Sequence, residues 1–137
     1  MTINKLNPYV NFNGDCSKAI ALYQKALGAK VENLMRYSDL PGNPHDSDNK
    51  DRVLHCQLQI DAVTLMVSDV PAERPIASGG NAHVLIEIDE AAAGAKAFQA
   101  LAAGGWITVP LGPAFWGGQF GMLTDAFGVQ WMVNCPA

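Results

Sequence analysis

This chain repeats itself. The predicted order strand, helix, strand, strand, strand occurs twice along its 137 residues. Val63–Ser68 aligns without gaps on Val129–Asn134, and Tyr9–Ala29 lies over His83–Ala103 at a constant offset of 74 residues. A chain that gives the same order twice predicts two similar modules, and its length is that of one domain with room for a real core.

We therefore predict an α+β fold of two βαβββ modules, over about residues 6–70 and 81–135, within a single domain of residues 1–137. The linker, over about residues 71–80, contains two prolines and two glycines. Each module covers one sheet face with its own helix and leaves the other face bare. Pairing two modules would form paired curved mixed sheets around a cup-shaped cavity. The sequence leaves open whether the modules pair within one chain or by exchange between two chains.

The apolar periodicity and the turn residues place each element along the chain. In the first module we expect strands at Pro8–Asn13, Lys30–Tyr37, Arg52–Ile60 and Val63–Asp69, and a helix that Gly28 ends near Leu27. In the second module we expect strands at His83–Ile88 and Trp106–Val109, a helix over Glu90–Ala103, and a closing hairpin of Gln119–Thr124 and Val129–Val133. Ser38–Lys50 is rich in turn formers and predicts a loop.

Composition excludes several classes of function. The chain is 49% hydrophobic and 16% charged, which is typical of a folded protein, and it has no apolar run of the ~20 residues that cross a bilayer. No signal-like segment opens it, so we expect a cytoplasmic protein with no membrane partner. The net charge is −4 and the nine Lys and Arg residues are scattered, which argues against nucleic acid as a partner. The three cysteines have no zinc-like spacing.

The sheet faces that the helices leave bare can be predicted from the alternation of each strand. They combine uncharged hydrogen-bonding side chains with a few large apolar ones, and only one acidic residue is among them. The set is Tyr9, Asn11, His55, Gln57, Gln59, Thr64, Met66, Ser68, His83, Leu85, Glu87, Gln130, Met132 and Asn134. This mixture is typical of a small-molecule pocket, where apolar area gives affinity and a few polar groups fix orientation.

The doubled pattern, the start PYVNFNG, the segment His55–Ile60, the pair Ser68-Asp69 and the ending FWGGQFGMLTDAFGVQWMVN together resemble a known family. The sequence is similar to the PhnB-like branch of the vicinal oxygen chelate superfamily, which includes glyoxalase I, bleomycin-resistance proteins, fosfomycin-resistance enzymes and extradiol dioxygenases. The resemblance covers nearly the whole chain. It implies the glyoxalase/bleomycin-resistance fold and a homodimer, but a fold does not fix a function.

The resemblance also implies where a metal ion would be held. In metal-dependent members, His, Gln or Glu ligands lie on the first and last strands of each half. Here those positions fall on His83, on Tyr9 or Pro8, and on Met66 and Met132. Thioethers are poor ligands for hard divalent ions, so one ligand of four remains. We expect no cofactor, and the alternative is a Zn, Mn, Ni or Fe ion in a shifted site of His83, His55 and Glu87.

Our leading hypothesis is a small-molecule-binding protein without the inherited metal, which acts by sequestration or by metal-free acid–base chemistry. His83 is the candidate catalytic residue, because imidazole titrates near neutral pH. The candidate ligand-binding residues are Tyr9, Asn11, His55, Gln57, Met66, Ser68, Trp116, Met132 and Asn134.

Two other readings remain open, so the sequence does not decide whether this is an enzyme. One is a metal-dependent lyase, isomerase or dioxygenase acting on a substrate with vicinal oxygens. The other is a structural partner protein whose cup is filled by its own side chains. A methyltransferase is not expected, because the chain has no glycine-rich strand-to-helix turn followed by an acidic residue.

Overall fold

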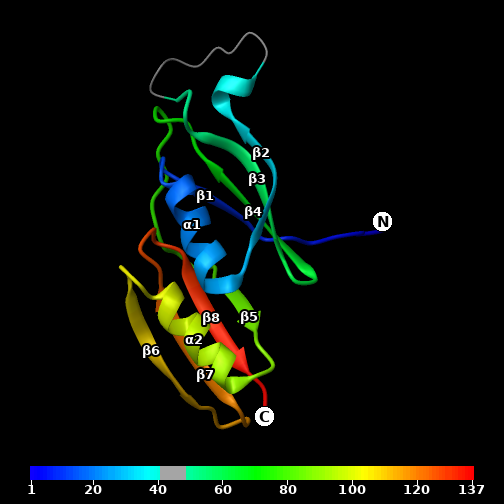
Figure 1. The fold of residues 1–137 in the computed structure, drawn as a ribbon, viewed down its shortest axis with the longest axis vertical. Helices are drawn as coiled ribbons and strands as arrows, with labels where there is room; N and C mark the ends of the chain where they lie inside the picture. The colour runs from blue at the N-terminus through cyan, green and yellow to red at the C-terminus, as the bar shows by residue number, and fades with distance from the viewer. Residues whose placement is uncertain (41–48) are drawn as a thin grey trace. The chain divides into compact units, whose positions relative to one another are not determined.

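Each half of the chain folds around its own four-stranded sheet (Figure 1). The computed structural model describes residues 1–40 and 49–137. By contacts it separates into two units, Met1–Gln24 with Gly28–Ala77, and Ser78–Ala137 with Lys25–Leu27. Most of the loop predicted at Ser38–Lys50 lies outside the described residues.

The first unit contains β1 (Tyr9–Phe12), α1 (Cys16–Leu27), β2 (Lys30–Arg36), the short 3₁₀ helix η1 (Tyr37–Asp39), β3 (Val53–Ile60) and β4 (Val63–Asp69). The second contains β5 (Val84–Glu87), α2 (Ala91–Leu101), β6 (Trp106–Pro113), β7 (Gln119–Thr124) and β8 (Gln130–Cys135). The α+β class and the order of elements given twice are therefore confirmed. How the two modules pair, and hence the cup, stays a prediction.

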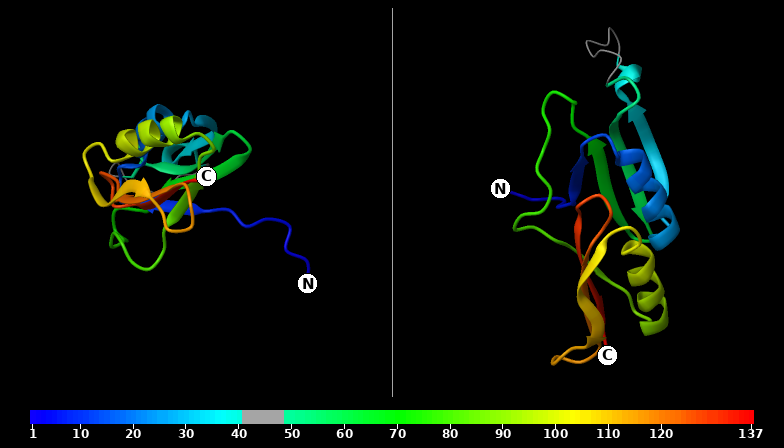
Figure 2. Two further views of the ribbon diagram at one scale, coloured as in Figure 1. Left: turned by 90° about the horizontal axis from the view of Figure 1, so that it is seen from below. Right: turned by 90° about the vertical axis from the view of Figure 1, so that its left-hand side faces the viewer.

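The two sheets have the same topology. Their strand orders are β1-β4-β3-β2 and β5-β8-β7-β6, so the last strand of each module lies next to the first. This pair, at one edge of each sheet, is parallel and the other pairs are antiparallel, which makes both sheets mixed. Within each unit the helix covers one face of its sheet (Figure 2).

The register of the first strands corrects the sequence alignment. Tyr9 lies opposite Met66 in the first unit, and Leu85 lies opposite Met132 in the second. Because Met66 and Met132 are equivalent, the first strands correspond at an offset of 76 residues, and the offset of 74 that paired Tyr9 with His83 is wrong. A shift of two residues keeps the same side chains on the same face, so the alternation itself was unaffected.

Two predicted turns are confirmed by left-handed backbone. Gly28, at φ 66°, ends α1 and donates its N–H to the Gln24 carbonyl. Gly128, at φ 90°, closes the β7–β8 hairpin and donates to the Asp125 carbonyl. No helix in the described part of the chain is long and apolar enough to span a membrane.

All three thiols are buried in the helix-covered cores, and this predicts alkaline instability. Burial is the main cause that raises the pKa of Cys16, Cys56 and Cys135 above the ordinary 9.0. In the unfolded chain these thiols ionise near that value, whereas in the folded chain they stay protonated. Above about pH 9 the unfolded state therefore binds fewer protons, and the free energy of unfolding falls as pH rises.

Ionisation of the Cys16 thiol in the unfolded chain should lower the free energy of unfolding by at most about 1.4 kcal/mol per pH unit. Denaturant unfolding of the wild type and Cys16→Ala at about pH 8, 9 and 10 would measure it. The two curves of stability against pH should converge as pH rises, because the variant lacks one ionising thiol. Parallel curves would contradict the prediction.

Candidate functional site

The strand register identifies the face of each sheet that its helix leaves uncovered, here called the open face. Residues opposite each other in a register point to the same side of a sheet. The pairs Cys56–Val67 and Leu58–Leu65 are buried and lie on the helix side of the first sheet, so their neighbours along the strands lie on the open face. In the second sheet, buried Leu123 and Trp131 mark the helix side in the same way.

Two predicted residues form a hydrogen-bonded pair on the open face of the first unit. The Tyr9 hydroxyl lies 2.9 Å from His55 Nδ1, and the two ring centroids are 5.7 Å apart. Tyr9 comes from β1 and His55 from β3, and Met66 of β4 lies between the two strands. The phenol contacts Nδ1 and so orients the imidazole, and within residues 1–40 and 49–137 no hydrogen bond is made by Nε2.

A second polar pair extends the same face toward the sheet edge. Asn33 Nδ2 donates to Gln57 Oε1 at 2.9 Å. Asn33 has φ 54°, and the register of β2 with β3 shifts between Glu32 and Met35. This bulge turns the Asn33 amide toward Gln57 and leaves Met35 opposite His55, with its side chain exposed.

Other predicted residues of the first unit differ in accessibility. Ser68 is buried, and its hydroxyl donates a hydrogen bond to the Leu54 carbonyl at 2.8 Å, so this donor is already used within the fold. Asn11 lies opposite Ser68 in the register and is exposed. Met66 is half-buried at the centre of the face.

On the open face of the second unit, three side chains are linked in a row by hydrogen bonds. Trp116 Nε1 donates to Asn134 Oδ1 at 3.3 Å, and Asn134 Nδ2 donates to Glu87 Oε2 at 3.3 Å. Trp116 lies in the turn between β6 and β7, where Phe115 and Phe120 meet its ring nearly edge-on at centroid distances of 4.8 and 5.3 Å. Both predicted ligand residues, Trp116 and Asn134, therefore belong to one connected group.

The predicted catalytic residue stands apart from that group. His83 lies just before β5 and is exposed, and its side chain makes no hydrogen bond to any residue in the ranges 1–40 and 49–137. Leu85, exposed, and Met132, half-buried, follow on the same face.

The residues at the inherited metal positions do not fit a divalent metal ion. Those positions fall on Tyr9 or Pro8, Met66, Met132 and His83, and they offer at most one phenol, two thioethers and one imidazole. A Zn²⁺ or Mn²⁺ ion normally needs at least three good protein donors, and this set supplies one. The shifted set takes His55 from one unit and His83 and Glu87 from the other, and it stays a prediction.

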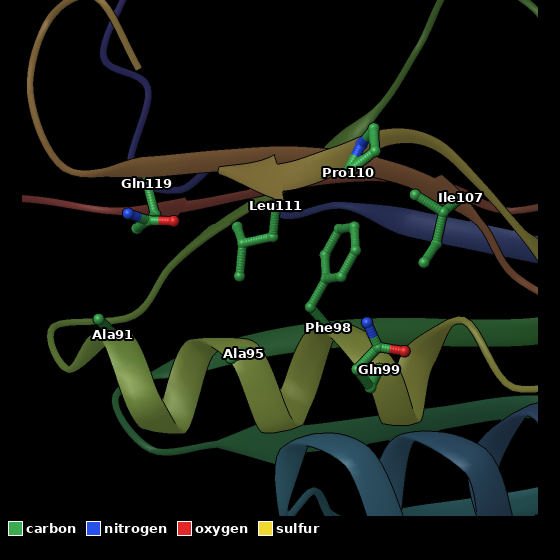
Figure 3. Close-up of a pocket in the computed structure, with 8 residues that line it drawn as sticks. All are labelled: Ala91, Ala95, Phe98, Gln99, Ile107, Pro110, Leu111 and Gln119. Atoms are coloured by element: carbon green, nitrogen blue, oxygen red, sulfur yellow. The ribbon is translucent and has the colours of Figure 1, made fainter. Parts of the chain in front are cut away.

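A separate small cavity of about 240 Å³ lies on the helix side of the second sheet (Figure 3). Gln119 lies toward one end and Ile107 with Gln99 toward the other, with Leu111 and Phe98 between them (Figure 3). It opens between α2 and β6, where Ala91 and Ala95 are too small to fill the space. None of the predicted site residues lines it.

Sequence reasoning missed Asn33, Met35 and Phe120. Asn33 and Met35 lie on the bulged strand β2, where strict alternation fails, although an Asn within a strand is a recognised sign of left-handed backbone. Phe120 alternates with buried Gly121 and could have been assigned to the open face from the hairpin pattern.

Comparison with known proteins gives a consistent result. The Glyoxalase/Bleomycin resistance protein/Dioxygenase superfamily matches residues 5–133. Protein YjdN from Escherichia coli (strain K12) is 32% identical over 139 residues, covering 94% of this chain and 93% of YjdN.

Two solved structures are similar over almost the whole chain. Protein PA1353 from Pseudomonas aeruginosa is 37% identical with a TM-score of 0.87, and the match covers 98% of each chain. A PhnB protein from Bacillus cereus is 20% identical with a TM-score of 0.80, covering 96% of this chain and 99% of its own. The predicted resemblance to the glyoxalase, bleomycin-resistance and dioxygenase superfamily is confirmed.

Proposed function

The chain belongs to the Glyoxalase/Bleomycin resistance protein/Dioxygenase superfamily, and we propose that it is a small-molecule-binding protein whose organic ligand lies against the open sheet faces. One observation carries the proposal. On both faces, polar side chains are held by each other, as in Tyr9–His55 and Trp116–Asn134, beside large exposed apolar side chains. Polar groups that are oriented in advance lose less entropy when a ligand binds.

Three of the four strands of the first unit support this proposal through the lack of charge on their open faces. The open-face residues of β1, β3 and β4 include no Lys, Arg, Asp or Glu, whereas a sheet face that only meets water normally carries them. Met66 and Met132 supply soft, adaptable apolar surface at the centre of each face.

Acid–base chemistry without a metal ion is the second element of the proposal. His83 remains the candidate catalytic base, and His55 is the better oriented imidazole. In the tautomer that carries its proton on Nδ1, His55 donates a hydrogen bond to the Tyr9 oxygen, and Nε2 can then accept a proton from a bound ligand. Dimerisation, a cytoplasmic location and the absence of a metal ion remain expectations of the same proposal.

The test is ligand binding by protein stripped of metal. We expect less than about a tenth of an equivalent of Zn, Mn, Ni or Fe in protein purified without chelator. In a thermal-shift screen, some small aromatic and heteroaromatic compounds should stabilise the protein. They should still do so after the protein has been dialysed against chelator. A hit at about 100 times its Kd stabilises the folded state by about 2.7 kcal/mol, which is a shift of several degrees.

Variants identify the surface that binds. Gln57→Ala and Trp116→Ala should weaken the shift, whereas Val63→Ala, at an exposed apolar side chain on the helix side of the first sheet, should not. Near-stoichiometric metal that disappears in His83→Ala would overturn the proposal and favour the metal-dependent lyase, isomerase or dioxygenase.

A further inference from the structure

The aromatic turn of the second unit adjoins an exposed carboxylate that accepts one long hydrogen bond from the fold. Here the Trp116 cluster means Phe115, Trp116, Phe120, Asn134 and Glu87. Two hydrogen bonds of 3.3 Å, through the Asn134 amide, connect the indole of Trp116 to the carboxylate of Glu87. Glu87 and Asn134 lie opposite each other on β5 and β8, and the turn before β7 brings the aromatic rings to them.

Glu87 differs from the buried carboxylates of this chain. Asp69 and Asp125 each accept three hydrogen bonds from N–H groups of the fold. Glu87 is exposed, and it accepts one long bond at Oε2. Its Oε1 has no hydrogen-bond partner in the described part of the chain. A negative charge with unused acceptor capacity therefore lies on the open face.

The aromatic rings are arranged so that a flat molecule can still reach the indole. Phe115 and Phe120 meet the Trp116 ring at interplanar angles of 83° and 71°, so neither stacks flat on it. Trp116 stays 54% exposed and Phe115 97% exposed. Nearby, Leu85 and Met132 add apolar surface beside Glu87.

We propose that the Trp116 cluster binds flat organic cations, that is, aromatic rings that carry a positive charge. The face of an indole ring is electron-rich and attracts cations, and an adjacent carboxylate adds charge complementarity. Glu87 also repels anions, and the net charge of −4 acts in the same direction. This inference rests on the proposed function, because it names the class of ligand for one of the two open faces.

Three quinoline derivatives of similar shape and different charge test the inference. The full-length ¹⁵N-labelled protein is titrated at about pH 8 with 1-methylquinolinium, quinoline and quinoline-4-carboxylate, and the indole N–H resonances of its three tryptophans are followed by NMR. We expect the cation to bind at least about fivefold more tightly than neutral quinoline, and the carboxylate to bind weakest. The Trp116 resonance should move, and that of buried Trp131, which is bonded to Asp125, should not.

The matched variants separate charge from shape. Glu87→Gln keeps an acceptor for Asn134 and removes the charge, so the affinity for 1-methylquinolinium should fall about fivefold to tenfold while that for quinoline changes less than about twofold. Glu90→Gln removes the same charge at the start of α2, where its side chain makes no capping bond, and should leave both affinities unchanged.

Failure of this inference can be told apart from failure of the proposed function. Equal binding of quinoline and its cation, an unchanged affinity in Glu87→Gln, or no movement of the Trp116 resonance would each overturn the cation inference. Hits from the broader metal-free screen would still support a small-molecule-binding protein in that case. The absence of any hit in that screen would overturn the proposed function itself.

Discussion

Replacing Asp69 with alanine should lower the free energy of unfolding by about 3–5 kcal/mol. Asp69, at the end of β4, is 1% exposed and accepts three backbone hydrogen bonds. Oδ1 takes the N–H groups of Gly14 and Cys16 at 2.8 and 3.0 Å, and Oδ2 takes that of Val53 at 2.9 Å. Alanine would leave three N–H groups without this acceptor, and two of them belong to the fully buried residues Cys16 and Val53.

The same contacts explain how α1 begins. Asp15 occupies the N-cap position of α1, but its side chain makes no capping bond. The carboxylate of Asp69 binds the first helical N–H instead, from a strand more than fifty residues later. Favourable contact between an anion and a helix N-terminus adds to the effect.

Denaturant unfolding followed by circular dichroism would measure the loss. Asp15→Ala is the matched control, because that carboxylate is exposed, and it should cost less than about 0.5 kcal/mol. Asp69→Asn should lie between them, because its oxygen can still accept from two N–H groups while its amide faces the third donor. A loss below about 1 kcal/mol in Asp69→Ala would show that the three bonds contribute little.

Asp125→Ala should cost a similar 3–5 kcal/mol in the second unit. Asp125 is fully buried at the start of the hairpin turn. Oδ1 accepts the N–H groups of Phe127 and Val129 at 2.9 and 3.0 Å, and Oδ2 accepts Trp131 Nε1–H at 3.0 Å. The carboxylate thus shapes the turn and holds the largest core side chain of that sheet.

The indole of Trp131 gives this variant its own readout. In Asp125→Ala its N–H resonance should shift and exchange faster with solvent, while thermal unfolding should occur many degrees lower. Asp89→Ala, at an exposed carboxylate of the same unit, is the control and should be nearly neutral. An unchanged melting temperature in Asp125→Ala would contradict the role assigned to this carboxylate.

The candidate site was partly readable before the structure. Alternation along β3, β4 and β8 assigned His55, Gln57, Met66, Met132 and Asn134 to the open faces, because a strand that buries one side must present the other. The partners of these side chains were not readable. Tyr9 and His55 are far apart in sequence, and only strand pairing brings them within hydrogen-bonding distance.

The main error in the prediction was the alignment of the first strand of the second module. An offset of 74 placed His83 at the position of Tyr9, whereas the register gives that position to Leu85. Ala-rich helices align almost equally well at neighbouring offsets, so residue identity could not fix the register. Hydrogen bonding between β5 and β8 fixes it, and this leaves His83 just outside the strand.

For this protein, local sequence determined what depends on neighbouring residues. The strands, the helices, the Gly28 stop and the Asp125–Gly128 turn follow from side-chain periodicity and from glycine's access to left-handed backbone. Tertiary structure decided what depends on pairing between distant segments, namely the register, the capping of α1 by Asp69, and the contact of Trp116 with Asn134 and Glu87. Such contacts are selected by the packing of whole sheets, and the residues between their partners carry no local signal of them.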